Sequence, residues 1–128
     1  MAVNLRKYTV IEGQNFANEV GFGQAGSVFI DSDGASSPPT GLVFVAITFI
    51  DDTIFDTGAG GLVAEDSANF ANTVAAAHDN ADGSETASEG SGGLQIDVSN
   101  IFPAGITIYG RWSEIDLTSG MIIAYIGV

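Results

Sequence analysis

Cysteine is absent from this 128-residue sequence, and so are long apolar runs. Without cysteine the chain has no disulfide framework, no thiolate metal site and no cysteine nucleophile. The longest apolar run, LVFVAITFI at residues 42–50, is far shorter than the roughly 20 residues that span a bilayer. The start of the chain, MAVNLRKYTVIEG, has no apolar run of signal-peptide length. We therefore expect a soluble protein that is not embedded in a membrane.

Positive charge is scarce as well. The chain has 3 Lys and Arg against 16 Asp and Glu, a formal net charge of −13. Contacts with nucleic-acid phosphates and attraction to anionic lipid both need Lys and Arg. This balance excludes nucleic acid and membrane surfaces as main partners. Strong acidity by itself indicates solubility through self-repulsion.

Two of the three cations, Arg6 and Lys7, lie in the first ten residues, which contain no acid. Residues 11–128 hold all 16 acids and a single Arg, so their formal charge is −15. Two interpretations of residues 1–10 follow. They form either a positive arm that docks on an acidic surface or a first strand, LRKYTVI, with two solvated charges. The strand is the simpler interpretation.

Short runs of β-branched and aromatic residues, bounded by Gly, Pro, Ser and Asp, dominate the chain and are typical of β-strands. A hairpin is expected over residues 114–128, with its turn at 118–120 and a positive φ at Gly120. No βαβ rhythm is present. The pattern predicts a single all-β domain over residues 1–128, an antiparallel β-sandwich or a jelly-roll-like barrel. Further strands are expected at residues 7–11, 26–31, 42–50, 94–98 and 106–112, with a more polar strand or hairpin arm at 51–58.

Three segments have distinct expectations. Residues 42–50 are apolar on both faces, which predicts a central strand covered by two layers or by its own core and a neighbouring subunit. Residues 62–78 favour an extended or irregular excursion with at most one helical turn. Residues 79–93 have no large apolar side chain and predict a long exposed loop.

Catalytic motifs are lacking. The one histidine, His78, has Ser and Asp neighbours in sequence, but no nucleophile motif accompanies it. Asp51 and Asp52 are adjacent, so on a strand their side chains point to opposite faces and make a poor acid–base pair. We expect no catalytic residue, no cofactor and no enzyme activity.

Two acidic turns, DSDG at residues 31–34 and DNADGSE at residues 79–85, offer the oxygen ligands that calcium takes. Neither matches an EF-hand loop, and Asp-Gly turns are common in β-proteins, so no metal site is assigned. Aromatic residues near the C-terminus, Tyr109, Trp112 and Tyr125, could stack on sugars. In a β-sandwich such residues more often belong to a core or an interface.

The stretch ITIYGRW, residues 106–112, gathers rare residue types on one predicted strand. Alternation assigns Trp112 to the core face, with Ile106, Ile108 and Gly110, and assigns Tyr109 and Arg111 to the opposite face with Thr107. Gly110 within a strand indicates a bulge or the close approach of another backbone.

A lone cation in an acidic body needs a carboxylate, so Arg111 is expected to form an ion pair. The partners considered are Glu114 and Asp116, nearby in sequence, and, across strands, Asp51, Asp52 and Asp56. Tyr and Arg are also enriched in subunit interfaces. We therefore name Arg6, Lys7, Tyr109 and Arg111 as the candidate interface residues.

The pattern FPAGITIYGRWSEIDLTSGMIIAYIG at residues 102–127, with FVAITFIDDTIFD at 44–56, resembles a group of small acidic virion proteins of tailed bacteriophages, including marine and cyanobacterial phages. The resemblance covers mainly residues 42–66 and 94–128, and YGRW is its most distinctive element. It implies a non-enzymatic virion structural protein, either a capsid decoration (cement) protein or another accessory surface component.

We expect the chain on the outer surface of the capsid, after synthesis in the host cytoplasm. The expected partners are the major capsid protein and further copies of the chain, as a homo-oligomer for which we suggest a trimer. The alternative is a tail- or fibre-associated adhesin that recognises a host surface or a glycan. An enzyme that uses acidic residues ranks last.

Overall fold

The computed structural model of the chain describes residues 25–66, 69–74 and 95–128. Within these ranges the chain is all-β, with antiparallel strands and one 3-10 turn, which confirms the predicted fold class. No helix in the described ranges is long and apolar enough to cross a membrane. The predictions for Arg6, Lys7, His78, the first strand and the loop at residues 79–93 lie outside these ranges.

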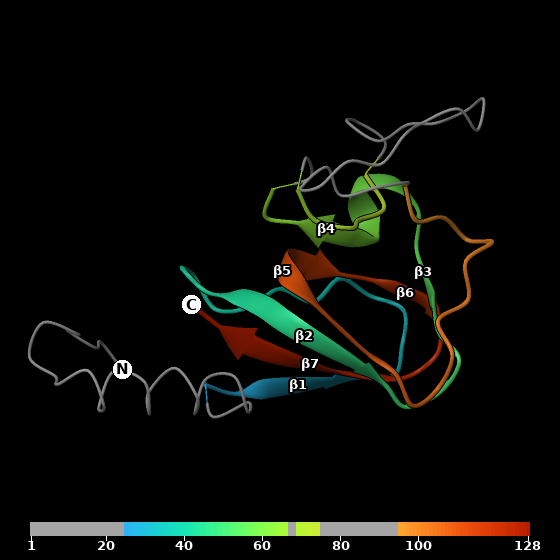
Figure 1. The fold of residues 1–128 in the computed structure, drawn as a ribbon, viewed down its shortest axis with the longest axis horizontal. Helices are drawn as coiled ribbons and strands as arrows, with labels where there is room; N and C mark the ends of the chain where they lie inside the picture. Colours follow the sequence, from blue (N-terminus) through green and yellow to red (C-terminus); the bar gives the residue numbers. More distant parts are fainter. Residues whose placement is uncertain (1–24, 67–68, 75–94) are drawn as a thin grey trace, which may run out of the picture.

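Two antiparallel sheets build the described part of the chain, and Figure 1 shows the smaller one beside one end of the larger. The larger sheet has the strand order β1-β7-β2-β5-β4, and the smaller one pairs β3 with β6. The elements are β1 (Ser27–Ile30), β2 (Val43–Phe49), β3 (Ile54–Phe55), the 3-10 turn η2 (Gly58–Gly60), β4 (Leu62–Ala64), β5 (Thr107–Ile115), β6 (Leu117–Ser119) and β7 (Ile122–Gly127).

β2 lies at the centre of the larger sheet, between β7 and β5, as its apolar run predicts. Phe44 pairs with Ile126 of β7 and Ala46 pairs with Tyr125, so β2 holds one more residue than β7 between these pairs. The extra residue, Val45, creates a bulge that reverses the alternation of side chains along the strand. The core residues Phe44 and Ile47 are consequently three positions apart, whereas Ile47 and Phe49 are two apart.

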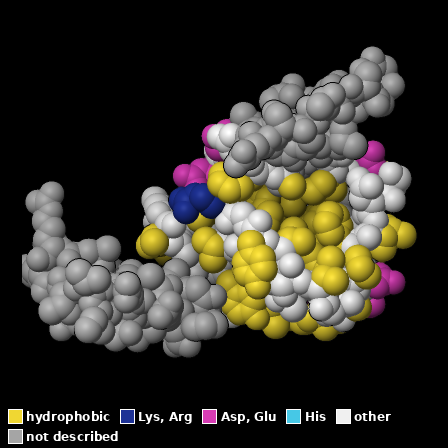
Figure 2. Space-filling model, in the orientation of Figure 1, with side chains coloured by type: hydrophobic (Ala, Val, Ile, Leu, Met, Phe, Trp, Pro, Cys, Tyr) yellow, Lys and Arg dark blue, Asp and Glu magenta, His cyan; other side chains and the backbone are white. Residues whose placement is uncertain are grey.

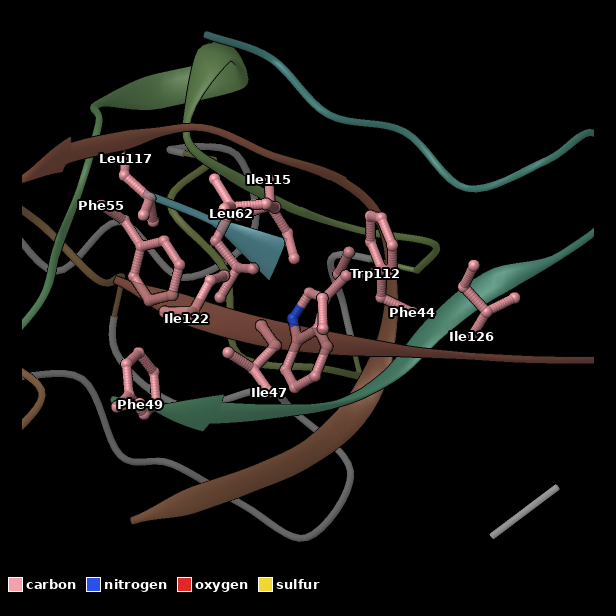
Figure 3. Close-up of a cluster of buried hydrophobic side chains, with 13 residues drawn as sticks. Phe44, Ile47, Phe49, Phe55, Leu62, Trp112, Ile115, Leu117, Ile122 and Ile126 are labelled. Carbon is pink, nitrogen blue, oxygen red and sulfur yellow. The ribbon is translucent and has the colours of Figure 1, made fainter. Parts of the chain in front are cut away.

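The hydrophobic core receives side chains from every described strand (Figure 3). Trp112 of β5 is 1% exposed, and its Nε1 donates a hydrogen bond of 2.8 Å to the carbonyl oxygen of Ala71. Burial of each large apolar side chain contributes about 1.5–3 kcal/mol relative to exposure. The core cluster consists of Ile30, Phe44, Ile47, Phe49, Phe55, Leu62, Ala64, Trp112, Ile115, Leu117, Ile122, Ala124 and Ile126.

Three phenylalanines join the two sheets. Phe49 of β2 stacks on Phe102 with 5.0 Å between ring centroids, and Phe55 of β3 meets both rings edge-on at 5.9 and 5.2 Å. A reciprocal pair of 2.9 Å backbone hydrogen bonds between Thr53 and Phe102 holds this arrangement. Because the rings meet in stacked or edge-to-face arrangements, these contacts fix the relative orientation of the three rings as well as burying them.

Thr73 fastens the segment 69–74 to the turn before β4. It is fully buried, its hydroxyl donates to the carbonyl oxygen of Gly58 at 2.6 Å, and that hydroxyl accepts the N–H of Leu62 at 2.9 Å. The backbone N–H of Thr73 donates to the carbonyl oxygen of Leu62 at 2.8 Å. The expectation of an extended or irregular segment is correct for the described residues here, since residues 62–64 form a strand and residues 69–74 form neither strand nor helix.

The hairpin predicted over residues 114–128 is wrong, although Gly120 does have a positive φ, of 112°. β6 pairs with β3 in the smaller sheet, whereas β7 pairs with β1 and β2 in the larger one. The chain thus changes sheet at Asp116 and again after Ser119. Alternation along a sequence shows which side chains are buried, but it does not show which strand becomes the neighbour.

The strand predicted at residues 94–98 is also wrong, because residues 95–98 form no strand. The carboxylate of Asp97 accepts the backbone N–H of Ser99 at 2.8 Å, and the N–H of Asp97 donates to Asn100 Oδ1 at 2.9 Å. Such side-chain bonds to the backbone compete with a sheet ladder and favour a turn.

Candidate functional site

The side of the larger sheet that points away from the core is the main candidate site, and we call it the outer face. Its residues alternate with the core residues along β1, β7, β2 and β5. Strand register arranges eight of them in two rows, each given in the order β1, β7, β2, β5. The first row is Phe29, Ile123, Thr48 and Thr107, and the second is Ser27, Tyr125, Ala46 and Tyr109.

Large apolar side chains of the outer face reach solvent. Tyr109 is 77% exposed and Phe29 is 54% exposed, while Ile123 and Tyr125 between them are half-buried. Figure 2 shows hydrophobic side chains gathered on one face of the molecule, with acidic side chains at its rim. Contiguous exposed apolar area of this kind is typical of a surface that binds another molecule.

None of the eight outer-face side chains is charged, although the described residues as a whole hold ten acids and one Arg. The hydroxyls of Thr48 and Thr107 hydrogen-bond to each other at 2.9 Å, so part of the polar capacity of the face is already used. The face offers apolar area and aromatic rings. It has the chemistry of a binding surface for a protein or a sugar.

Arg111 lies at one end of this face and has the carboxylate partner that its isolation predicts. Its Nε lies 2.5 Å from Glu65 Oε2, and its Nη1 donates to the carbonyl oxygen of Val128 at 2.8 Å. The backbone N–H of Glu65 donates to the carbonyl oxygen of Arg111 at 2.9 Å. Both side chains are more than a third exposed, so solvent screens the pair.

Glu65 is not among the five acids that the sequence suggested as partners of Arg111. β4 pairs with β5, with Ala64 opposite Trp112, and this register places the residue after Ala64 beside Arg111. The pairing of two strands more than 40 residues apart decides the contact. No local pattern in the sequence predicts the contact between Arg111 and Glu65.

Trp112 is a core residue, as alternation predicts. Its ring leaves no room for a side chain at position 110. A Cβ at position 110 would lie 2.8 Å from Cζ2 of the Trp112 ring. The close approach expected at Gly110 is therefore made by a side chain and not by another backbone. Ile108 packs against the core as expected, whereas Ile106 was assigned to the core face and is 40% exposed.

Three carboxylates, those of Asp33, Asp56 and Asp116, have oxygens within 4.8 Å of one another. The N–H of Gly34 donates to Asp116 Oδ1 at 2.9 Å, and the hydroxyl of Thr118 donates to Asp56 Oδ1 at 2.9 Å. Carboxylate oxygens are ligands for hard cations such as Ca²⁺, which takes six to eight oxygen ligands in all, carbonyl and water oxygens included. Of the two acidic turns considered for calcium, DSDG contributes Asp33 to this cluster, and residues 79–85 lie outside the described ranges.

The cluster raises the pKa of Asp33 above its usual value of 3.8. The side-chain hydrogen bond with Asp116 is the largest cause, followed by the negative charges of Asp116 and Asp56. The opposite happens at Asp97, where hydrogen bonds from the hydroxyl and the N–H of Ser99 lower the pKa. The pKa values of these two exposed carboxyls are thus shifted in opposite directions.

The carboxylates of Asp51 and Asp52 accept hydrogen bonds from backbone N–H groups rather than forming an acid–base pair. Asp51 Oδ1 accepts the N–H of Asp52 at 2.8 Å, and Asp52 Oδ1 accepts the N–H of Ala104 at 3.0 Å. The first bond lies within the turn after β2, and the second joins this turn to the segment before β5. They are the structural roles that the sequence favours over an acid–base pair.

A second group of exposed apolar side chains lies in the segment that leads into β5 and at the end of β2. Ile101 is 62% exposed, Val98 49%, Ile106 40% and Ile50 43%. The sequence analysis missed this group, and it missed Phe29 as well. Val28, Phe29 and Ile30 are all apolar, so the pattern of β1 does not show which side chain faces out.

Comparison with protein-family models, with curated proteins and with solved structures found no match to this chain. The resemblance to phage virion proteins, carried by YGRW and its surroundings, therefore stays a prediction.

Proposed function

We propose that this chain is a non-enzymatic structural protein of a tailed-phage virion, a decoration protein that binds the outer surface of the capsid as a homo-oligomer. The resemblance over residues 102–127 supports the virion context. One observation supports binding: a small β-domain exposes two groups of large apolar side chains, on the outer face and in the segment before β5.

A decoration protein makes two kinds of contact, with the shell and with its own copies. Two exposed apolar surfaces fit that requirement. The segment before β5, with Val98 and Ile101, is our candidate for the contact with the major capsid protein. The shell repeats its binding sites, so contacts that are individually weak add through multivalency.

The acidic surface fits the same role. A net charge of −13 keeps free copies soluble through mutual repulsion before they assemble. Binding to the shell then depends on apolar contact and not on phosphate or lipid charge. Partners with strongly basic surfaces would bind the acids at the rim instead.

Mass spectrometry of purified virions from the phage that encodes the chain tests this function. We expect a copy number close to that of the major capsid protein, and heads of lower thermal stability when the gene is deleted. A chain absent from the virion would contradict the proposal.

The adhesin alternative has one observation in its favour, the 77% exposure of the Tyr109 ring, because an exposed ring can stack on a sugar. It predicts a few copies per particle on the tail or fibres. It also predicts that the purified chain binds host cells or a glycan array, and that Tyr109→Ala abolishes this binding. A high copy number on the head without glycan binding would exclude the adhesin.

A further inference from the structure

We propose that two copies of this chain pair through their outer faces, about a two-fold axis that runs parallel to the strands between β7 and β2. This inference rests on the homo-oligomer of the proposed function but not on capsid binding. It names the surface and the symmetry of self-association. The argument uses the charge of the face, the order of its side chains and its area.

Charge favours a second copy as the occupant. Each copy carries a net charge of −13, so most surfaces of two copies repel each other. The eight residues of the outer face carry no charge, which makes this face a place where two copies can meet without opposing carboxylates. A basic partner would find no acid to bind within these rows.

Side-chain size in the first row is self-complementary. From β1 to β5 the row is Phe29, Ile123, Thr48, Thr107, two large residues followed by two small ones. The proposed axis reverses the strand order in the second copy, so a β1 residue faces a β5 residue and a β7 residue faces a β2 residue. Phe29 then lies over Thr107 of the second copy, and Ile123 lies over Thr48.

The second row obeys the same rule. From β1 to β5 it is Ser27, Tyr125, Ala46, Tyr109, small and large residues in alternation. Reversal places Tyr109 over Ser27 of the second copy and Tyr125 over Ala46. All eight positions therefore set a large side chain against a small one, as interdigitating sheets require.

A two-fold contact of this kind is isologous and closes on itself. Sheets stacked face to face lie about 10 Å apart, with strand directions within about 30° of each other. Four strands spaced by about 4.8 Å, and roughly 20 Å long, give a face of about 400 Å². A standard interface buries about 800 Å² on each partner, so the pair is expected to dissociate on dilution.

Analytical ultracentrifugation of the whole chain over a range of concentrations tests the pairing. We expect a reversible monomer–dimer equilibrium that strengthens with salt, because screening reduces the repulsion between the acidic bodies. Tyr109→Glu places a carboxylate in the contact and should weaken pairing by at least about tenfold. The matched control, Ile101→Glu, adds the same charge at an exposed apolar side chain away from the rows and should leave pairing nearly unchanged.

Thiol cross-linking tests the symmetry, because the chain has no cysteine of its own. A mixture of Phe29→Cys and Thr107→Cys chains should give a cross-linked dimer with a short bismaleimide. Phe29→Cys alone should not, because the axis separates the two copies of position 29 by about three strand spacings, roughly 14 Å. Circular dichroism checks that each variant is folded.

A monomer at every concentration would overturn the pairing, as would equal effects of the two Glu variants or cross-linking of Phe29→Cys alone. A trimer, which the sequence analysis suggested, would overturn it as well, since three-fold symmetry does not set Phe29 against Thr107. Glycan binding by the face without self-association would also overturn it. None of these outcomes decides capsid binding, which the copy number in virions tests separately.

Discussion

Arg111 and Glu65, 46 positions apart in sequence, form an ion pair beside the β4–β5 pairing, with 2.5 Å between Nε and Oε2. The same guanidinium also donates to the carbonyl oxygen of Val128, the residue after β7. One side chain therefore connects β5, the residue after β4 and the residue after β7. Solvent reaches both charges, so the connection contributes modestly to stability.

Arg111→Ala is expected to lower the free energy of unfolding by about 1 kcal/mol or less, since exposed ion pairs contribute in that range. Urea denaturation measures the loss. Glu65→Gln and the double variant complete a mutant cycle, in which the coupling energy should be positive and smaller than about 1 kcal/mol. A coupling energy of zero would show that the pair does not contribute.

Gly110→Ala is expected to destabilise the fold by about 1–3 kcal/mol, because the new methyl group overlaps the buried Trp112 ring and overpacks the core. Trp112 is the single tryptophan of the chain, so its fluorescence reports the displacement directly. The matched control is Gly60→Ala, where a Cβ meets no atom within 4 Å. Equal stability of the two variants would contradict this explanation of Gly110.

Thr73→Val keeps the shape of the side chain but removes the hydroxyl that bonds Gly58 and Leu62. The buried N–H of Leu62 then loses its partner and the half-buried carbonyl of Gly58 loses one of two, so the expected loss is about 1–3 kcal/mol. Thr48→Val is the control, because the hydroxyl of Thr48 bonds another hydroxyl at a half-exposed site. Thermal unfolding of both variants should show the larger decrease for Thr73→Val.

Asp33→Asn is expected to change how stability depends on pH. The raised pKa of Asp33 means that the folded chain holds the proton more tightly than the unfolded chain. This group therefore stabilises the fold at low pH, and that contribution is lost as pH rises through the raised pKa. At pH 7 the Asn variant, which lacks the repelling charge, should melt at a higher temperature than the parent, and this advantage should shrink toward pH 3.8.

Asp97→Asn is the matched control with the opposite sign. Because its pKa is lowered, Asp97 stabilises the fold above pH 3.8, and this contribution is lost as pH falls through the lowered value. The Asn variant should therefore melt below the parent at neutral pH and approach it in acid. Parallel melting curves for the two Asn variants across pH would refute both assignments.

Local periodicity was enough to predict several parts of this structure. The uninterrupted apolar run placed β2 at the centre of the larger sheet, and alternation separated the buried Trp112 from the exposed Tyr109 and Arg111. Gly120 was recognised as a residue with positive φ. Each of these properties depends on neighbouring residues in sequence, which is why a single sequence contains the information.

Properties that depend on distant pairing could not be predicted in the same way. Glu65 reaches Arg111 only because β4 lies beside β5, and the three-aspartate cluster forms only because Asp33 and Asp56 approach the corner at Asp116. The hairpin prediction failed for the same reason, since β6 and β7 belong to different sheets. The rows of the outer face likewise require the register of four strands.

The bulge at Val45 has a consequence for how β2 tolerates change. A substitution there alters one half-buried side chain. Removal of Val45 would make Phe44 and Ala46 neighbours opposite Ile126 and Tyr125, so the pairing with β7 would become regular and Phe44 would keep facing the core. A deletion elsewhere in β2 would instead turn the side chains beyond it to the opposite face. With respect to β7, the bulge is therefore the position in β2 where the number of residues can change without exchanging the two faces of the strand.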